Sequence, residues 1–147
     1  MHRVLVLGAG KIGRMIARFL MDSGDFDVLV GDVSDTALQR IASLTGAEVC
    51  HVDATNPADL KRALEGRQTV LSALSYHHNP LVATTALTSG ASYFDLTEDV
   101  ATSDAVAAIA EKAADGQVFM PQCGLAPGFI SIVAHDLINW FERIETV

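Results

Sequence analysis

Three glycines with the spacing Gly-x-Gly-x-x-Gly, at Gly8, Gly10 and Gly13, follow an apolar run at residues 4–7 and begin a helical pattern at residues 11–22. Strand, glycine turn and helix in this order predict a phosphate site. Gly8 makes the tight turn, Gly10 leaves room for a pyrophosphate, and Gly13 lets the helix pack close to the sheet. The helix start adds free N–H groups and a positive dipole end. The predicted phosphate-binding residues are Gly8, Ala9, Gly10, Lys11, Ile12 and Gly13. The alternative is a glycine-rich turn without a ligand.

An acidic residue supports the same interpretation. Asp32 ends the next strand-like run, 19 positions after Gly13, where a dinucleotide fold places an acid that accepts hydrogen bonds from the adenosine ribose. A 2′-phosphate would meet like charge there, and Val33 offers no compensating arginine. Asp32 and Val33 therefore predict NAD in preference to NADP. The alternative is that Asp32 only begins a turn before the following helix.

Strand-like and helical patterns alternate along the chain. The expected strands cover residues 4–7, 26–30, 47–52, 69–74, 92–95 and 117–120, and the expected helices cover roughly 11–22, 35–45, 57–65, 80–89 and 100–115. Asn56-Pro57 and Asn79-Pro80 supply helix N-caps. This alternation predicts an α/β fold, a doubly wound parallel sheet of the Rossmann type with about six strands and helices on both faces.

The C-terminal part of the chain does not continue this alternation of strands and helices. Residues 127–141 are expected to form one more helix, and residues 142–147 resemble the start of another strand. We therefore expect a dinucleotide-binding domain over residues 1–141, with 142–147 beginning a second, substrate-binding domain that the sequence does not contain.

Residues at the carboxyl ends of the strands are expected to line the ligand crevice. Asp53 and Ala54 are placed beside the adenine, although Asp53 could instead cap the next helix. Small residues after the fourth strand let a dinucleotide pass close to the backbone, and the loop at Gly124 is expected near the nicotinamide. The acids after the fifth strand could bind a substrate ammonium group or form a solvated loop. The candidates are Asp53, Ala54, Ala73, Leu74, Ser75 and Gly124 for the cofactor, and Tyr76, Asp95, Thr97 and Glu98 for a substrate.

No residue is assigned as a catalytic acid, base or nucleophile. Cys123 has no base placed beside it by the sequence, and is expected to be a small buried apolar residue. His77 and His78 are adjacent and have no further ligands, so they are expected in a polar loop and no metal site is predicted. Any chemistry is therefore expected to be that of the cofactor.

The composition excludes some classes of partner and indicates the compartment. The net charge of −8 and the sequence pI near 4.9 argue against nucleic acid or an anionic membrane as partner. No apolar stretch reaches the ~20 residues of a membrane span, and the chain runs from Met1 into a strand without room for a signal peptide. Two lone cysteines indicate a reducing compartment. A cytoplasmic protein is expected.

With these residues in place, the chain resembles the N-terminal domain of the saccharopine dehydrogenase family. The stretches that carry the resemblance are residues 6–13, 72–79 with 92–97, and Cys123-Gly124-Leu125-Ala126-Pro127-Gly128. The resemblance implies an NAD(P)-dependent oxidoreductase that acts at a carbon–nitrogen bond of an amino acid or amino-acid adduct by hydride transfer to nicotinamide, with an imine intermediate. It also implies a second domain that supplies most substrate contacts, so residues 1–147 alone are expected to bind cofactor without turnover.

A second family is similar over the first half of the chain. The NAD-sensing regulatory domains of potassium transporters and channels share the glycine turn, the acid after the second strand and the pattern seen in residues 52–60. That resemblance implies a sensor without catalysis, in which residues 93–95 and 124–128 have no role. In the dehydrogenase interpretation, exposed surface meant for the missing domain could bring two copies together as a homodimer.

Overall fold

Six parallel strands form one sheet in the computed structural model, which describes residues 1–143 and 146. The strand order is β3-β2-β1-β4-β5-β6, and every neighbouring pair is parallel. The strands are β1 (His2–Leu7), β2 (Phe26–Asp32), β3 (Glu48–His51), β4 (Thr69–Ser72), β5 (Ser92–Asp95) and β6 (Phe119–Met120). The order reverses between β1 and β4, which is where open α/β sheets bind ligands.

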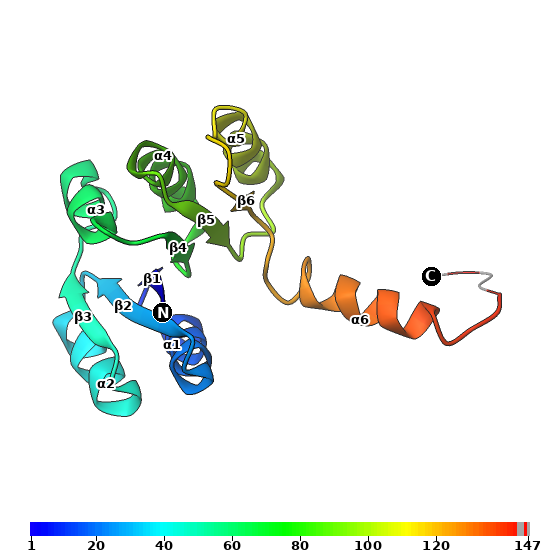
Figure 1. Cartoon of the computed structure of the whole chain (residues 1–147), viewed down its shortest axis with the longest axis horizontal. Coiled ribbons are helices and arrows are strands. Elements are labelled where there is room, and N and C mark those ends of the chain that lie inside the picture. Colours follow the sequence, from blue (N-terminus) through cyan, green and yellow to red (C-terminus); the bar gives the residue numbers. More distant parts are fainter. Residues whose placement is uncertain (144–145, 147) are drawn as a thin grey trace.

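Helices cover both faces of this sheet (Figure 1). One layer contains α1 (Lys11–Ser23) and α2 (Asp35–Thr45), and the other contains α3 (Pro57–Leu64), α4 (Asn79–Ser89) and α5 (Val100–Ala110). A short 3₁₀ helix, η1 (Tyr76–His78), precedes α4. This is the doubly wound Rossmann arrangement predicted from the sequence.

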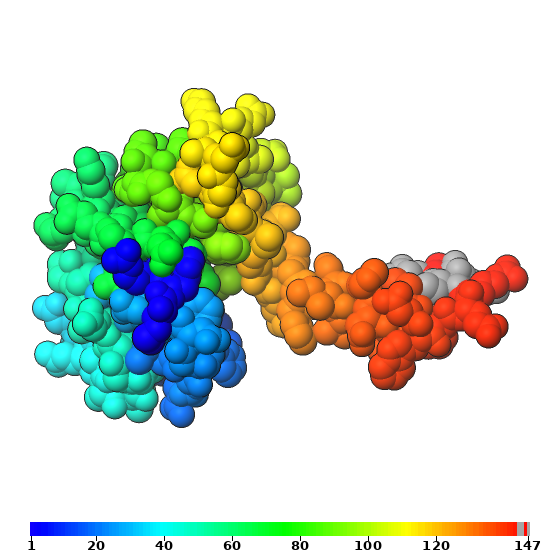
Figure 2. Space-filling view, viewed as in Figure 1, coloured from blue at the N-terminus to red at the C-terminus, as the bar shows by residue number. Residues whose placement is uncertain are grey.

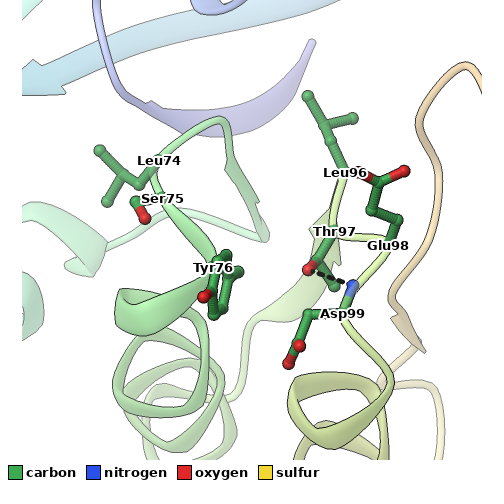
Figure 3. Close-up of a pocket in the computed structure, with 7 residues that line it drawn as sticks. All are labelled: Leu74, Ser75, Tyr76, Leu96, Thr97, Glu98 and Asp99. Carbon is green, nitrogen blue, oxygen red and sulfur yellow. Dashed lines mark hydrogen bonds between the residues drawn. The ribbon is translucent and has the colours of Figure 1, made fainter.

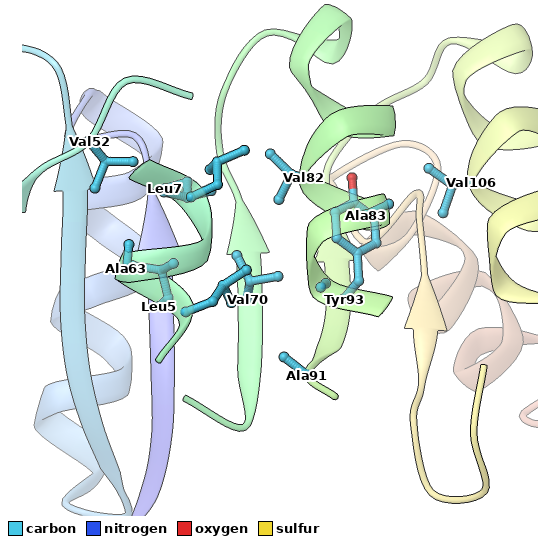
Figure 4. Close-up of a cluster of buried hydrophobic side chains, with 13 residues drawn as sticks. Leu5, Leu7, Val52, Ala63, Val70, Val82, Ala83, Ala91, Tyr93 and Val106 are labelled. Atoms are coloured by element: carbon cyan, nitrogen blue, oxygen red, sulfur yellow. The ribbon is translucent and has the colours of Figure 1, made fainter. Parts of the chain in front are cut away.

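The apolar run of β1 divides between two cores. Leu5 and Leu7 belong to the cluster under α3, α4 and α5, whereas Val4 and Val6 belong to the cluster under α1 and α2. Figure 4 shows the first cluster lying between these helices and the sheet. Because alternate residues of a strand point to opposite faces, a strand buried on both faces must be continuously apolar, as residues 4–7 are.

Most expected elements agree with the structure, and the differences lie at their ends. Ser34, Asn56 and Asp99 cap α2, α3 and α5 with side-chain hydrogen bonds. The prediction that Asn79 is an N-cap was wrong, because it is the first residue of α4 and His78 holds the cap position. The side chain of Asn79 is buried and accepts a hydrogen bond from the Ser72 hydroxyl at 2.8 Å.

Several elements are shorter than expected: β3, β4 and the last helix, α6 (Phe129–Ile138), each lose residues at their ends relative to the expected 47–52, 69–74 and 127–141, and so do α5 and β6. The helix predicted over 100–115 ends at Ala110, and residues 112 and 113 donate to carbonyls three positions back, as in a tight final turn. The strand predicted over 117–120 begins at Phe119. The Gln117 side chain instead bonds the turn around it, accepting from the Ala114 N–H and donating to the Ala91 carbonyl.

The last helix, α6 (Phe129–Ile138), projects away from the sheet (Figures 1 and 2). It begins after Gly128, whose φ is +124°, and none of its residues is buried. Large apolar side chains are exposed on it and beside it, at Leu125, Phe129, Ile130, Ile132, Leu137, Trp140 and Phe141. Among the described residues, no helix has the length and apolar character to cross a membrane. The strand expected over 142–147 includes residues 144, 145 and 147, which lie outside the described residues.

Candidate functional site

The glycine turn after β1 is packed tightly on its inner side. Gly8 has φ +102°, a conformation that favours glycine, and its N–H donates to the Gly31 carbonyl of β2 at 2.8 Å. A Cβ on Gly8 would lie 2.9 Å from the Ala73 carbonyl oxygen, and a Cβ on Gly13 would collide with the Gly8 carbonyl oxygen. Gly8 and Gly13 are therefore required by the packing of α1 and β4 against the turn.

Gly10 is different, because its missing side chain faces outward. A Cβ built there would have no described neighbour within 4 Å, and the φ of −68° suits any residue. The first helical hydrogen bond runs from the Arg14 N–H to the Gly10 carbonyl at 3.0 Å, so the N–H groups of Lys11, Ile12 and Gly13 are the free donors of the helix start. Open space beside free donors fits a pyrophosphate.

Asp32, at the end of β2, is bonded to this turn. One carboxylate oxygen accepts from the Ala9 N–H at 2.7 Å, and the other accepts from the Ser34 N–H at 2.8 Å. The bond to Ser34 belongs to the turn that leads into α2, while the bond to Ala9 joins β2 to the glycine turn. Since a carboxylate can accept about four hydrogen bonds, both oxygens keep capacity for a ligand hydroxyl.

A pocket of about 170 Å³ lies beside Asp32 at the carboxyl ends of the strands. Its lining includes the predicted residues Asp32, Val33, Asp53, Ala54 and Leu74. Asp53 does not cap α3, since Asn56 does; instead its carboxylate accepts from the N–H and the hydroxyl of Thr55. These bonds hold the pKa of Asp53 below its ordinary value, so the pocket carries negative charge at neutral pH.

A second pocket, of about 540 Å³, lies between the loops that follow β4 and β5 (Figure 3). Leu74 lines both pockets, so the two are neighbours along one edge of the sheet. The sequence-predicted residues in its lining are Leu74, Ser75, Tyr76, Thr97 and Glu98, and the lining is completed by Leu96 and Asp99.

This second pocket is acidic. Glu98 is exposed, and the Asp99 carboxylate accepts from both the hydroxyl and the N–H of Thr102 at the start of α5. Those bonds, with a smaller contribution from His77, hold the pKa of Asp99 below its ordinary value. An ionised carboxylate at the rim favours a cationic group in the pocket.

Asp95, one of the predicted substrate residues, lies behind this pocket. It is fully buried and is absent from the pocket lining. Its carboxylate accepts hydrogen bonds from the Tyr93 hydroxyl at 2.6 Å, the Thr97 N–H at 2.9 Å and the Gln122 N–H at 3.2 Å. Direct contact between Asp95 and a substrate does not fit this burial.

Two further predicted residues also lie behind the crevice. Ala73 forms the floor under the glycine turn, and Gly124 packs against the loop that follows β5, where a Cβ would lie 3.1 Å from the Leu96 carbonyl oxygen. The neighbouring Cys123 is partly buried, and its thiol lies 3.3 Å from the Met120 carbonyl oxygen. Burial and the nearby Asp95 raise the pKa of the Cys123 thiol, so it is not an activated nucleophile.

Sequence reasoning missed some lining residues. His78 lines the smaller pocket, although the sequence placed it in a polar loop, and Leu96 and Asp99 line the larger one. For Leu96 and Asp99, the position in the loop directly after β5 was the available signal, whereas His78 lies in η1, six residues after β4. Within the described part of the chain, no group of three or more His, Cys, Asp or Glu residues could hold a metal ion.

Comparison with known protein families agrees with this geometry. Residues 4–120 match the model of the saccharopine dehydrogenase NADP-binding domain. The chain belongs to this family. Membership in the saccharopine dehydrogenase family places the glycine turn in an NAD(P)-binding domain of the dehydrogenase type, as the resemblance of residues 6–13 and of 72–79 with 92–97 implied.

Solved structures share the fold of this saccharopine dehydrogenase-type domain. Apo saccharopine dehydrogenase (L-Glu forming) from Saccharomyces cerevisiae aligns with a TM-score of 0.82 at 22% identity, over 95% of this chain and 31% of that chain. Scyllo-inositol dehydrogenase from Lactobacillus casei, solved with bound NAD(H) and scyllo-inositol, aligns with a TM-score of 0.74 at 14% identity, over 95% and 41%. The TrkA-N domain of an inner membrane protein from Escherichia coli aligns with a TM-score of 0.64 at 19% identity, over 96% and 97%. The chain thus spans about a third of the length of the yeast enzyme.

Proposed function

We propose that this chain binds NAD along the carboxyl edge of its sheet and forms the cofactor-binding part of an oxidoreductase. The proposed reaction oxidises a carbon–nitrogen bond of an amino acid or amino-acid adduct: the carbon gives a hydride to the nicotinamide, the nitrogen loses a proton, and an imine forms. The observation that carries the proposal is the glycine turn. Gly8 and Gly13 are fixed by packing, whereas the open space at Gly10 lies beside the free N–H groups at the start of α1, where a pyrophosphate would fit.

The proposed path of the dinucleotide follows the two neighbouring pockets. The pyrophosphate lies on the turn from Gly8 to Gly13, the adenosine ribose on Asp32, and the adenine beside Asp53 and Ala54. The chain then passes Leu74, which lines both pockets. The nicotinamide reaches the larger pocket near Ser75, beside the loop that contains Gly124.

We propose NAD as the preferred cofactor because the space beside Asp32 is acidic. A 2′-phosphate would face the Asp32 carboxylate, and Val33 is 64% exposed without offering a positive charge. In a calorimetric titration, we expect NADH to bind more tightly than NADPH, and the double variant Asp32→Ser, Val33→Arg to reverse the order. Equal affinity of the unchanged protein for the two cofactors would refute the preference.

The bound nicotinamide supplies the hydride acceptor, and the residues of this chain orient the reactants around it. Glu98 and Asp99 favour a substrate ammonium group by charge, while Tyr76 and Thr97 offer hydroxyls in the same pocket. We assign no general acid or base to these residues. The remaining contacts are proposed to come from a second domain.

We propose that the complete protein carries this second, substrate-binding domain after residue 141, and that it works in the cytoplasm. The length of the yeast relative and the exposed apolar surface of α6 support a second domain. Residues 1–147 alone are then expected to bind NADH and to show no amino-acid-dependent NAD reduction, measured by absorbance of NADH. Turnover by residues 1–147 would show that the fragment contains the catalytic groups.

An NAD-sensing regulatory domain is the second candidate. It is favoured by one observation, the alignment with 97% of the TrkA-N domain. The two proposals differ in the complete protein: a dehydrogenase reduces NAD when supplied with its amino-acid substrate, whereas a sensor binds NAD and NADH without turnover. A screen of amino acids and their carboxyalkyl adducts against the complete protein separates them.

A further inference from the structure

The end of β5 contains a buried carboxylate that the proposed binding path does not use. Asp95 is 0% exposed, and three donors converge on it from Tyr93, Thr97 and Gln122. Tyr93 packs in the apolar cluster and directs its hydroxyl toward the carboxyl end of the strands (Figure 4). A buried carboxylate is costly unless it is hydrogen-bonded, and the three donors to Asp95 offset that cost. The elements that supply these donors show what the buried carboxylate holds together.

Its partners belong to two loops that border the larger pocket. The Thr97 N–H belongs to the loop of residues 96–99, which lines the pocket. The Gln122 N–H belongs to the loop of residues 121–128, which also bonds the main chain of Asp95 through the Cys123 N–H at 2.8 Å. One residue therefore connects both loops to the end of β5.

The second loop needs this support, because its backbone is strained. Gln122 has φ +64°, which costs a non-glycine residue about 1 kcal/mol. The same loop approaches the first loop closely at Gly124, against the Leu96 carbonyl. A shift of either loop would thus move the other and change the shape of the pocket where the nicotinamide is proposed to lie.

We propose that Asp95 is a positioning residue for the nicotinamide half of the cofactor, holding the loops 96–99 and 121–128 in one fixed arrangement. The inference rests on the proposed dinucleotide function. This positioning role differs from a general structural role, because the adenosine half is proposed to lie at the ends of β1, β2 and β3, away from both loops. Loss of the carboxylate should weaken contacts to nicotinamide and spare contacts to adenosine.

The test compares NADH with ADP, which carries only the adenosine diphosphate part. In Asp95→Asn, the amide oxygen can still accept from Thr97 and Gln122, and the amide N–H₂ can donate to the Tyr93 oxygen, so the protein should fold. Charged hydrogen bonds become neutral ones, and we expect NADH affinity to fall about three- to tenfold while ADP affinity stays unchanged. The enhanced fluorescence of bound NADH should fall as well.

The matched control is Ile41→Ala, a buried apolar truncation in α2 that contacts neither loop. It should lower the melting temperature and leave the ratio of NADH to ADP affinity as in the unchanged protein. The ratio of NADH to ADP affinity should fall further in Asp95→Ala than in Asp95→Asn, because only asparagine keeps an oxygen that accepts from the loops. The conservative variant therefore rescues part of the effect. An unchanged ratio of NADH to ADP affinity in Asp95→Asn overturns the positioning role alone. This holds whether both affinities stay the same or both fall by the same factor. If the unchanged protein binds neither ligand, the proposed function fails, and this inference fails with it.

Discussion

The three glycines of the turn differ in what a side chain would meet. At Gly8 and Gly13 an added Cβ meets backbone carbonyls, which cannot rotate away, whereas at Gly10 it meets open space. The Gly-x-Gly-x-x-Gly spacing alone treats the three as equivalent members of a motif. The structure separates the two glycines that the packing requires, Gly8 and Gly13, from Gly10, which the packing does not require.

This difference gives a paired prediction. Gly13→Ala should destabilise the fold by at least about 1–3 kcal/mol, the cost of overpacking, because the Gly8 carbonyl must move. Gly10→Ala should leave the melting temperature unchanged and reduce NADH binding strongly, since its methyl group would occupy the pyrophosphate position. Thermal unfolding and calorimetry on the two variants check both parts. Normal NADH binding by Gly10→Ala would remove the turn from the binding site.

Asp32 carries a second prediction at this scale. Asp32→Ala removes the acceptors for the Ala9 and Ser34 N–H groups as well as the proposed acceptor for the ribose. The free energy of NADH binding should become less favourable by about 1–2 kcal/mol, the scale of a hydrogen bond to a charged group. Free nicotinamide mononucleotide, which lacks the adenosine half, serves as the control ligand and should be unaffected. An unchanged affinity for NADH would exclude Asp32 from the site.

Individual residues also mark the limit of what the sequence predicts. The position of Asp32 follows from its spacing to the glycines, because both lie at adjacent strand ends. The burial of Asp95 does not follow from its position at a strand end, because it depends on the loop around Gln122 closing over β5 from 27 positions further along the chain. Long-range packing of this kind is absent from local patterns.

At the scale of elements, local signals located the helices and strands well, and long-range contacts set their ends. Asn56 caps α3 as predicted, because Pro57 fixes the first helical residue beside it. The same dipeptide at Asn79-Pro80 fails as a cap, since Asn79 is buried against β4 and its side chain bonds Ser72 instead. The tertiary partner thus overrides an identical local signal.

The cap of α5 predicts a dependence of stability on pH. Hydrogen bonds from Thr102 lower the pKa of Asp99 in the folded state below its ordinary value of 3.8. Its stabilising effect is therefore fully present above the unfolded pKa and is lost as the pH falls through the lower folded pKa. Asp99→Ala should lower the melting temperature by a few degrees at pH 7.

Asp99→Asn is the matched variant, because asparagine caps helices without titrating. It should melt close to the unchanged protein at pH 7. It should also lose less stability than the unchanged protein as the pH is lowered below 4. Parallel melting curves of the two proteins across this pH range would show that the Asp99 carboxylate is not the acid-sensitive cap.

At the scale of the whole molecule, α6 is the part that the sheet does not explain. The helix has ten residues, fewer than an isolated helix needs to be stable in water, and its apolar side chains point into solvent. Exposed apolar surface of this extent indicates an interface. In the complete protein we propose that a second domain covers it. In residues 1–147, a second copy is the partner of suitable chemistry.

The single tryptophan of the chain reports on this surface. Trp140 is 75% exposed in the isolated chain, so its fluorescence should be that of a water-exposed indole at low protein concentration. As concentration rises, we expect association through α6 and a blue shift of the tryptophan emission. The shift should be stronger at high salt, because screening reduces the repulsion between copies of charge −8.

The control variant Ile132→Glu, Leu137→Glu adds charge to α6, where no residue is buried against the sheet. It should keep the fold, and its tryptophan emission should stay that of an exposed indole at all concentrations. Sedimentation of both proteins supplies the mass. A monomeric unchanged protein, with Trp140 open to a soluble quencher at high concentration and high salt, would show that copies of this chain do not cover α6.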